Sequence, residues 1–303
     1  MAKENADTEK FKDILMLKRT ISGACFVAII VGFFLLRQYV DGLGVKLFQI
    51  LSFAFCSLAT FEVARAVKPY SAKGLLIPAT IFGILFVPTY CLTDYLFMQG
   101  FGYLFAIDLC LMFVLAFAIY TFAKGHDFKT FTISSLPIVY PALLILAMLV
   151  ANDVGEPNGF LAMLLIFVIS PCSDTMAYLV GMTYSKIKKG NVKKLCPRLS
   201  PNKTVAGAIG GLVGGILGSI LVYFIFRDSA DLVNFFSPIF FFILIGLVGS
   251  VLTILGDLLE SLIKRRTGLK DMGKIMPGHG GAMDRIDGMS LCAVFVCIMF
   301  LVV

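Results

Sequence analysis

Apolar stretches of about 20 residues recur along almost the whole of this 303-residue chain, and a helix of that length crosses the hydrocarbon layer of a bilayer. Hydrophobic residues make up 59% of the chain and charged residues only 15%. A soluble domain would not repeat such stretches from end to end. The sequence therefore predicts an all-α, polytopic transmembrane protein.

We predict about nine spans from the positions of these stretches, each uncertain by several residues at its ends. The predicted spans are residues 20–41, 45–67, 74–98, 102–123, 130–151, 157–184, 204–226, 232–262 and 288–303. The opening residues, MAKENADTEKFKDILMLKRT, are polar and carry no signal-peptide cleavage site, so we expect the first span to stay in the mature chain.

Basic residues indicate the orientation, because Lys and Arg are retained on the cytoplasmic side of a membrane. With nine spans and a cytoplasmic N-terminus, all but three of the 26 Lys and Arg fall in inside segments. The exceptions are Arg37, Lys46 and Arg227. We therefore expect the N-terminus in the cytoplasm.

The polar residues divide the chain into two regions. Residues 1–151, with spans one to five, carry isolated acids at Glu62, Asp94 and Asp108 that have no neighbours arranged for chemistry, so we interpret this region as a transmembrane scaffold. Residues 152–303, with spans six to nine, carry polar clusters in or beside the predicted cytoplasmic loops 185–203 and 263–287. We expect catalysis in this second region.

The strongest cluster begins at the end of span eight. If that helix continues past the membrane surface, Asp257, Glu260, Ser261, Lys264 and Arg265 fall on one face. One interpretation is a solvated helix end whose cations complement the helix dipole. It accounts well for the basic residues and poorly for Asp257, an acid still near membrane depth, where an unpaired carboxylate is costly.

A flexible turn follows, and after it come two more acids. The turn runs through His279, Gly280 and Gly281 and precedes Asp284 and Asp287, which face one way if the segment is helical. Together with Asp257 these acids offer the hard oxygen ligands that Mg²⁺ prefers. We predict Asp257, Asp284 and Asp287 as ligands of one Mg²⁺, or of a pair of cations that would act together on a phosphate.

Cations surround the predicted metal ligands. Lys264, Arg265, Lys270 and Arg285 are candidates for neutralising phosphate oxygens. A juxtamembrane loop is expected to be basic in any case, so a role in topology alone remains open for them.

A further acid lies in span six. Asp174, Tyr178, Gly181 and Ser185 share one helical face near the predicted cytoplasmic end. An Asp within an apolar span usually points into the protein and often has a functional partner. A structural hydrogen bond to a neighbouring helix is the competing interpretation.

The loop between spans six and seven is strongly basic. From Lys186 to Lys203 it holds six lysines, one arginine and no acid. Cytoplasmic bias and attraction to acidic lipid headgroups account for most of this charge, so we expect membrane lipids and no nucleic acid as partners. The corner at Ser200, Lys203 and Thr204 is more specific, because it precedes a glycine-rich helix start that can meet phosphate.

The glycines of span seven form rows at four-residue spacing, for example Gly207, Gly211 and Gly215. Small residues at this interval let helix backbones approach closely. We predict tight helix packing there.

These motifs together resemble the phosphatidate cytidylyltransferases, also called CDP-diacylglycerol synthases. The resemblance covers the C-terminal 130 or so residues in family order. It rests on Asp174-x-x-Ala177-Tyr178-x-x-Gly181, on Ser200-Pro201-x-Lys203-Thr204, on Gly256-Asp257 with Glu260, and on the long run from Ser261 to Asp287. The chain departs from the family pattern at Ser185, Ala206, Met276 and Ala282.

The resemblance implies a Mg²⁺-dependent enzyme that converts CTP and phosphatidic acid into CDP-diacylglycerol and pyrophosphate for phospholipid biosynthesis. It implies a homodimer in the cell membrane of a bacterium, with the site on the cytoplasmic side. The residues it implies for binding substrate are Ser200, Lys203, Asp174, Tyr178, Ser261, His279, Gly280 and Gly281. His279 is either a phosphate donor or only a turn residue.

Three other functions would share part of this pattern. A CTP-dependent kinase of a polyprenol or phytol would transfer the γ-phosphoryl group instead. A transporter would also use intramembrane acids and glycine-rich helices, but it would place polar interruptions in both halves of the chain. An inactive scaffold would not be expected to retain the acids.

Overall fold

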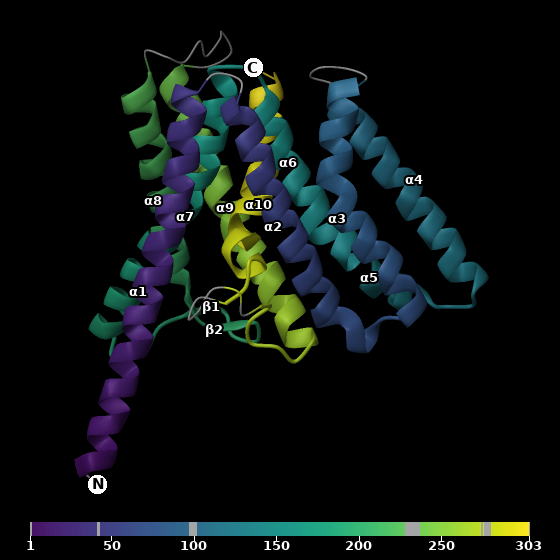
Figure 1. Cartoon of the computed structure of the whole chain (residues 1–303). Coiled ribbons are helices and arrows are strands. Elements are labelled where there is room, and N and C mark those ends of the chain that lie inside the picture. The colour runs from purple at the N-terminus through teal and green to yellow at the C-terminus, as the bar shows by residue number, and fades with distance from the viewer. Residues whose placement is uncertain are drawn as a thin grey trace.

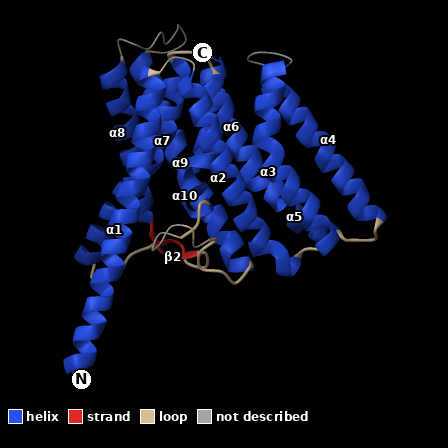
Figure 2. Cartoon of the chain, in the orientation of Figure 1, coloured by secondary structure: helices blue, strands red, loops and turns tan. Residues whose placement is uncertain are grey.

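The computed structural model describes residues 2–40, 43–96, 102–227, 237–273, 275 and 280–302. It is almost entirely helical, which confirms the predicted fold class (Figures 1 and 2). The helices are α1 (Ala2–Tyr39), α2 (Leu43–Val67), η1 (Lys68–Tyr70), α3 (Lys73–Leu96), α4 (Gly102–Ala123), α5 (Phe128–Pro137), η2 (Ile138–Ala142), α6 (Leu143–Asp153), α7 (Asn158–Ile187), α8 (Val205–Phe226), α9 (Pro238–Arg266) and α10 (Met283–Val302).

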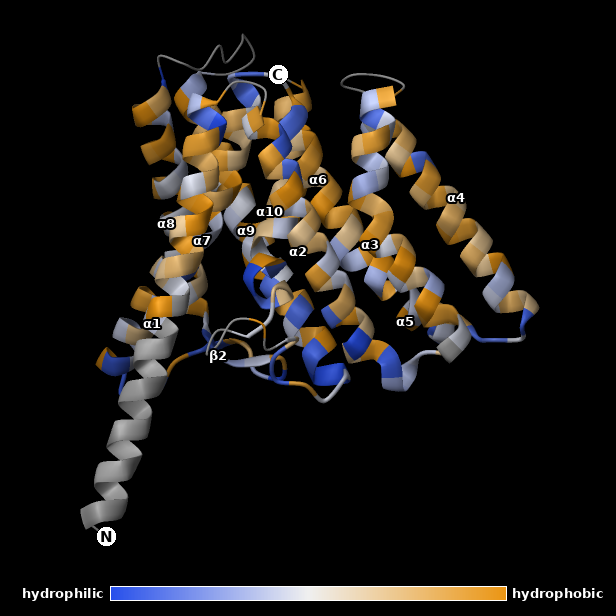
Figure 3. Cartoon of the chain, in the orientation of Figure 1, coloured by the Kyte–Doolittle hydropathy of each residue, from blue (hydrophilic) through white to orange (hydrophobic). Residues whose placement is uncertain are grey.

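Eight helical segments within the described residues are long and apolar enough to cross a membrane. They correspond to predicted spans two to nine, with α5, η2 and α6 forming one segment, Phe128–Asp153. The first predicted span lies in α1, whose described apolar part, Gly23–Tyr39, is shorter. Hydrophobic residues cover the middle of the bundle, and hydrophilic residues gather at its ends (Figure 3).

Two prolines shape the fifth span. Pro137 ends α5 and Pro141 lies within η2, a π-helical turn in which the Leu143 N–H donates to the Ile138 carbonyl. Proline supplies no N–H and crowds the preceding turn, so a wider turn relieves the helix without ending it. The side chain of Tyr140 in this turn is buried.

The glycine rows of α8 pack against two neighbouring helices, as predicted. A Cβ added at Gly207 would lie 2.8 Å from the Ala177 carbonyl oxygen of α7, and one at Gly214 would lie 2.5 Å from the Cys172 carbonyl oxygen. On the other side of α8, a Cβ at Gly215 would lie 1.7 Å from Ser250 Oγ of α9. Only glycine permits α7, α8 and α9 to approach this closely.

A second glycine contact brings α9 against α10. A Cβ at Gly256 would lie 2.3 Å from the Asp287 carbonyl oxygen, and one at Gly288 would lie 2.8 Å from Thr253 Cγ2. The two helices therefore cross where Asp257 follows Gly256 and where Asp287 precedes Gly288.

A two-stranded hairpin, which the sequence did not predict, connects α7 to α8. Strands β1 (Lys194–Cys196) and β2 (Ser200–Thr204) pair antiparallel, with an irregularity between the paired positions. Thr204 then caps α8 by accepting a hydrogen bond from the Gly207 N–H at 3.0 Å. Both predicted polar loops are shorter than expected, because α7 continues to Ile187, α9 to Arg266, and α10 begins at Met283.

Polar contacts also hold the two regions together at the end of the bundle opposite the hairpin. Arg37 of α1 donates to the Asn152 carbonyl at 2.9 Å and pairs with Glu156 at 2.9 Å. Asp153 accepts hydrogen bonds from the Tyr90 hydroxyl at 2.7 Å and from Gln49. These contacts tie α1, α2 and α3 to the start of the C-terminal region.

Candidate active site

Most of the predicted site residues meet at one end of the bundle, where α7 and α9 end and α8 and α10 begin (Figure 1). The hairpin lies at the same end. Four segments that are distant in sequence thus contribute side chains to one place.

Asp284, in the first turn of α10, is held on both of its carboxylate oxygens. Oδ1 accepts from Lys264 Nζ at 2.8 Å. Oδ2 accepts from the backbone N–H groups of Met272 at 3.0 Å and Gly281 at 2.7 Å. Only 7% of the side chain is exposed. In this arrangement Asp284 organises the segment between α9 and α10.

Lys264 joins two acids. It pairs with Glu260 one helical turn earlier and with Asp284 on the next helix. Glu260 is buried, and its Oε1 atom has no hydrogen-bond partner within the described residues. A buried carboxylate oxygen without a partner is costly, so it marks a position that suits a cation or a hydrogen-bond donor.

Asp257 is engaged differently. It pairs with Lys203 of β2, and Ser261 Oγ approaches its Oδ1 at 3.4 Å. Its side chain remains 30% exposed. The structure therefore brings the predicted corner before α8 against the predicted acid of α9, and it leaves Asp257 open to a ligand.

Asp174 and Asp287 complete the acidic group. Asp287 on α10 has Asp257 and Asp174 as electrostatic neighbours, and Asp174 on α7 has Asp257, Lys203 and Arg285. Three helices thus direct carboxylates toward one region, as the sequence predicted for the acids.

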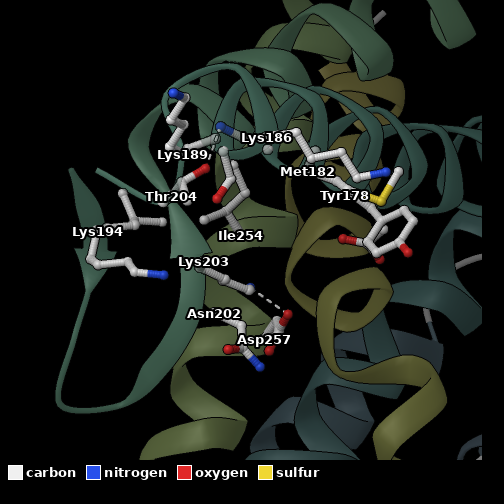
Figure 4. Close-up of a pocket in the computed structure, with 18 residues that line it drawn as sticks. Tyr178, Met182, Lys186, Lys189, Lys194, Asn202, Lys203, Thr204, Ile254 and Asp257 are labelled. Carbon is white, nitrogen blue, oxygen red and sulfur yellow. Dashed lines mark hydrogen bonds and ion pairs between the residues drawn. The ribbon is translucent and has the colours of Figure 1, made fainter. Parts of the chain in front are cut away.

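A cavity of about 760 Å³ opens beside this region, between α7, α8, α9 and the hairpin (Figure 4). It is lined by Asp174, Tyr178, Gly181, Ser185, Lys186, Lys189, Lys194, Asn202, Lys203, Thr204 and Asp257, among others. Of the predicted substrate residues that the structure describes, four do not line it: Ser200, Ser261, Gly280 and Gly281. Asn202 and the loop lysines take part instead, a role that the sequence did not single out.

The lining of this cavity includes none of the four predicted cations Lys264, Arg265, Lys270 and Arg285. Arg265 is exposed, and its Nε donates to the Leu199 carbonyl at 3.2 Å, which fastens the hairpin to the end of α9. Lys270 is exposed on the segment after α9. His279 lies outside the described residues.

The two glycines before α10 lie so close to acidic side chains that a larger residue would clash with them. Gly280 has φ +91°, a conformation that favours glycine, and a Cβ there would lie 2.8 Å from Asp284 Oδ2. A Cβ at Gly281 would lie 2.3 Å from Glu62 Oε2. Both residues therefore shape the segment around the acids, whatever else they bind.

Glu62 positions a segment of the site, a role that sequence reasoning missed. Its carboxylate accepts from the Ala282 N–H at 3.1 Å and from the Met283 N–H at 2.9 Å, and the residue is 1% exposed. An acid at these free N–H groups complements the start of α10. The expectation that Glu62 is an isolated acid is therefore wrong, because its carboxylate anchors the start of α10.

A neighbour on the same helix adds to this anchor. Arg65 Nη2 donates to the Met272 carbonyl at 2.7 Å. Helix α2 of the predicted scaffold thus holds both ends of the segment that positions Asp284. The only sequence signal was an acid within an apolar span, which is uncommon without a partner.

The acids of the site can be compared with the ligands that the predicted Mg²⁺ needs. Within the described ranges, no three His, Cys, Asp or Glu side chains are already grouped as a metal ion needs. Asp257 and Asp287 nevertheless supply hard oxygens and fit Mg²⁺, which keeps waters and substrate oxygens in its shell. Asp284 fits less well than Asp257, because its side chain is only 7% exposed and two backbone N–H groups already donate to its Oδ2 atom.

Comparison with known proteins assigns the chain. A sequence profile described as the Cytidylyltransferase family matches residues 17–303. The chain belongs to the cytidylyltransferase family. This confirms the resemblance noted in its motifs.

Similar proteins in this family include several named phosphatidate cytidylyltransferase. The one from Bacillus subtilis is 32% identical over 245 residues, covering 79% of this chain and 83% of that protein. The one from Thermotoga maritima is 30% identical over 176 residues, covering 57% and 60%. The one from Rickettsia conorii is 33% identical over 177 residues, covering 57% and 74%. None of these names favours a lipid kinase or a transporter.

Proposed function

We propose that this protein transfers CMP from CTP to phosphatidic acid and releases pyrophosphate. The observation that carries the proposal is the meeting of Asp174, Asp257 and Asp287, beside Lys203, at one end of a membrane-spanning bundle. Acids and cations that converge from separate helices suit a reaction between two phosphates. Membership of the cytidylyltransferase family supports the same reaction.

The cavity beside α7 and α8 is the proposed nucleotide site. Its four lysines, Lys186, Lys189, Lys194 and Lys203, would attract a triphosphate, and its volume lies within the usual range for small-molecule sites. Lys203 now pairs with Asp257. On binding, the lysine would move to a phosphate oxygen and free the carboxylate.

We propose that Asp257 and Asp287 hold Mg²⁺ when the nucleotide binds. The ion would offset charge on the α-phosphate and on the departing pyrophosphate. Lys264 would offset part of the negative charge of Glu260 and Asp284, which would weaken the repulsion between these acids and the incoming phosphates.

The chemical step needs no dedicated base. The phosphate of phosphatidic acid is ionised at neutral pH, so one of its oxygens can attack the α-phosphorus directly. A new phosphorus–oxygen bond forms there as the bond from the α-phosphorus to the bridging oxygen breaks, and its electron pair leaves with pyrophosphate. Holding the two anions together is the main task of the site.

The basic residues support an orientation. The basic segments 68–73 and 188–204 and the hydrophilic loop 124–127 lie at the same end of the bundle as the acids (Figure 3). We propose that this end faces the cytoplasm of a bacterial cell, where it meets CTP and lipid of the inner leaflet. We also propose that the protein acts as a homodimer.

Product analysis tests the function. Purified protein in detergent receives Mg²⁺, phosphatidic acid and CTP labelled at the α-phosphorus. We expect the label in the lipid and one pyrophosphate released per lipid product. A lipid-alcohol kinase would leave this label in soluble CDP and would require a lipid alcohol, and that result would refute the proposal.

A further inference from the structure

A second cavity, of about 640 Å³, lies at the same end of the bundle, between α2, α5, η2, α9 and α10. Its walls are mainly apolar and include Ile133, Leu136, Val139, Leu259 and Leu262. Lys129 of α5 and Arg266 of α9 also line it. Both lie at the ends of their helices, so the apolar cavity has a basic rim.

The two cavities lie on opposite faces of α9. Ile254 and Asp257 line the first cavity, whereas Leu259, Leu262 and Arg266 line the second. With about 3.6 residues per turn, these two sets point in nearly opposite directions. Glu260 and Lys264 lie between them on the helix. Ligands in the two cavities would therefore approach the acidic site from different sides.

Tyr140 connects the second cavity to the acids. It lines the cavity, is 3% exposed, and its hydroxyl has no hydrogen-bond partner within the described residues. The electrostatic neighbours of this hydroxyl are Asp287, Glu260, Asp257 and Asp284. A buried hydroxyl without a partner is costly, so its place beside the site points to a ligand oxygen.

The chemistry of this cavity selects its occupant. Apolar walls suit acyl chains, and the basic rim suits an anionic headgroup. A zwitterionic headgroup would be held less well, since its own cation would face Lys129 and Arg266. The first cavity, by contrast, is lined by lysines and Asp257 and suits a soluble polyanion.

We propose that the acyl part of the lipid substrate occupies the cavity between α2, α5, η2 and α9, and that the lipid phosphate reaches the acidic site past the Tyr140 hydroxyl. The identity of the lipid as phosphatidic acid rests on the proposed function. The two substrates then enter on opposite faces of α9 and meet near Asp287 and Glu260.

Crossed kinetics test this arrangement. Leu259→Trp fills the second cavity and Ile254→Trp fills the first. We expect Leu259→Trp to raise KM for phosphatidic acid about tenfold with KM for CTP changed less than about twofold, and Ile254→Trp to do the reverse. Equal effects of both variants on both substrates, or effects in the opposite sense, would overturn the proposal.

Tyr140→Phe tests the hydroxyl without changing the cavity. Since the ring remains, we expect the fold and KM for CTP to be preserved while kcat/KM for phosphatidic acid falls about tenfold. An unchanged kcat/KM for phosphatidic acid would show that the Tyr140 hydroxyl does not contact the lipid phosphate.

A binding measurement needs no turnover. The purified protein, without CTP, is exposed to phosphatidic acid bearing a photoreactive acyl chain, and the labelled peptides are mapped. We expect label on residues 133–144 and 259–266, competed by phosphatidic acid and not by phosphatidylcholine. Label on α7 and α8, or equal competition by both lipids, would overturn the proposal. If the label maps as expected while wild-type protein forms no lipid product, the lipid site stands and the proposed function fails.

Discussion

Single side chains explain how two distant parts of this chain make one site. Glu62 lies 220 and 221 residues before its hydrogen-bond partners Ala282 and Met283. Asp284 and Asp257 are both acids of the family signature, yet the first is enclosed by protein donors and the second is open to a ligand. The two should respond differently to substitution.

Glu62→Gln should destabilise the start of α10. The amide retains one acceptor and presents its NH₂ group to a buried backbone N–H, at a cost of about 1–3 kcal/mol. We expect a lower Tm and a loss of kcat, measured by thermal unfolding and lipid product formation. Asp108→Asn, at an exposed acid of α4, is the control. If the two variants behave alike, Glu62 has no positioning role.

Asp257→Asn and Asp284→Asn should separate ligand binding from structure. Asp257→Asn should abolish Mg²⁺-dependent activity with little change in Tm measured in EDTA. Asp284→Asn should lower both, because a buried acceptor of two backbone N–H groups and of Lys264 is weakened. Equal Tm for both variants would contradict the structural role of Asp284.

Gly273→Ala should disrupt the segment between α9 and α10, because the added methyl group would clash with the Glu62 side chain. Its Cβ would lie 1.7 Å from Glu62 Oε1. Overpacking of this kind costs about 1–3 kcal/mol. We expect activity to fall severely, as measured by initial rates. Gly74→Ala, which meets nothing within 4 Å, is the matched control and should retain full activity.

At the scale of the helices, the interface of α8 with α9 depends on one close pair. A Cβ at Gly215 would lie 1.7 Å from Ser250 Oγ, and this hydroxyl donates to the Gly246 carbonyl of its own helix at 2.6 Å. The interface therefore tolerates no side chain at Gly215 unless the hydroxyl is removed.

A double substitution tests this pair. Gly215→Ala should lower Tm by an amount that corresponds to about 1–3 kcal/mol, and adding Ser250→Ala should recover part of the loss. Leu217→Ala, on the exposed side of α8, is the control and should change Tm little. The absence of recovery would mean that the backbone contact with Gly246, and not the hydroxyl, sets the limit.

At the scale of the whole molecule, all the acids of the site lie at the end that carries the basic loops. If this end faces the cytoplasm, Ser71→Cys and Asp127→Cys should react with an impermeant maleimide only after cells are opened. Glu156→Cys, at the opposite end, should react in intact cells. Labelling above the background of the parent protein is the measurement, and the reverse pattern would invert the topology.

The apolar spans, the basic end of the bundle and the family signature could be predicted because each depends on residues close together in the chain. Helical periodicity depends only on nearby residues. It therefore predicted that Asp257 and Lys264 lie on one face of a helix and that Gly215 lies at a helix interface. The predicted importance of Lys203 rested on its motif, whereas its pairing with Asp257 required the fold.

The remaining features depend on contacts between helices that local patterns do not encode. Glu62 reaches α10 only because α2 packs beside the segment before it. Asp284 is enclosed because Lys264 and two backbone N–H groups donate to it, and Tyr140 lines a cavity with Leu259 and Ile263, the residues of α9 that lie beside Glu260. The tertiary structure decided which acids are enclosed and which partners they have. A solvated carboxylate adds little free energy to the folded state, whereas a buried one is costly unless the fold supplies hydrogen-bond partners.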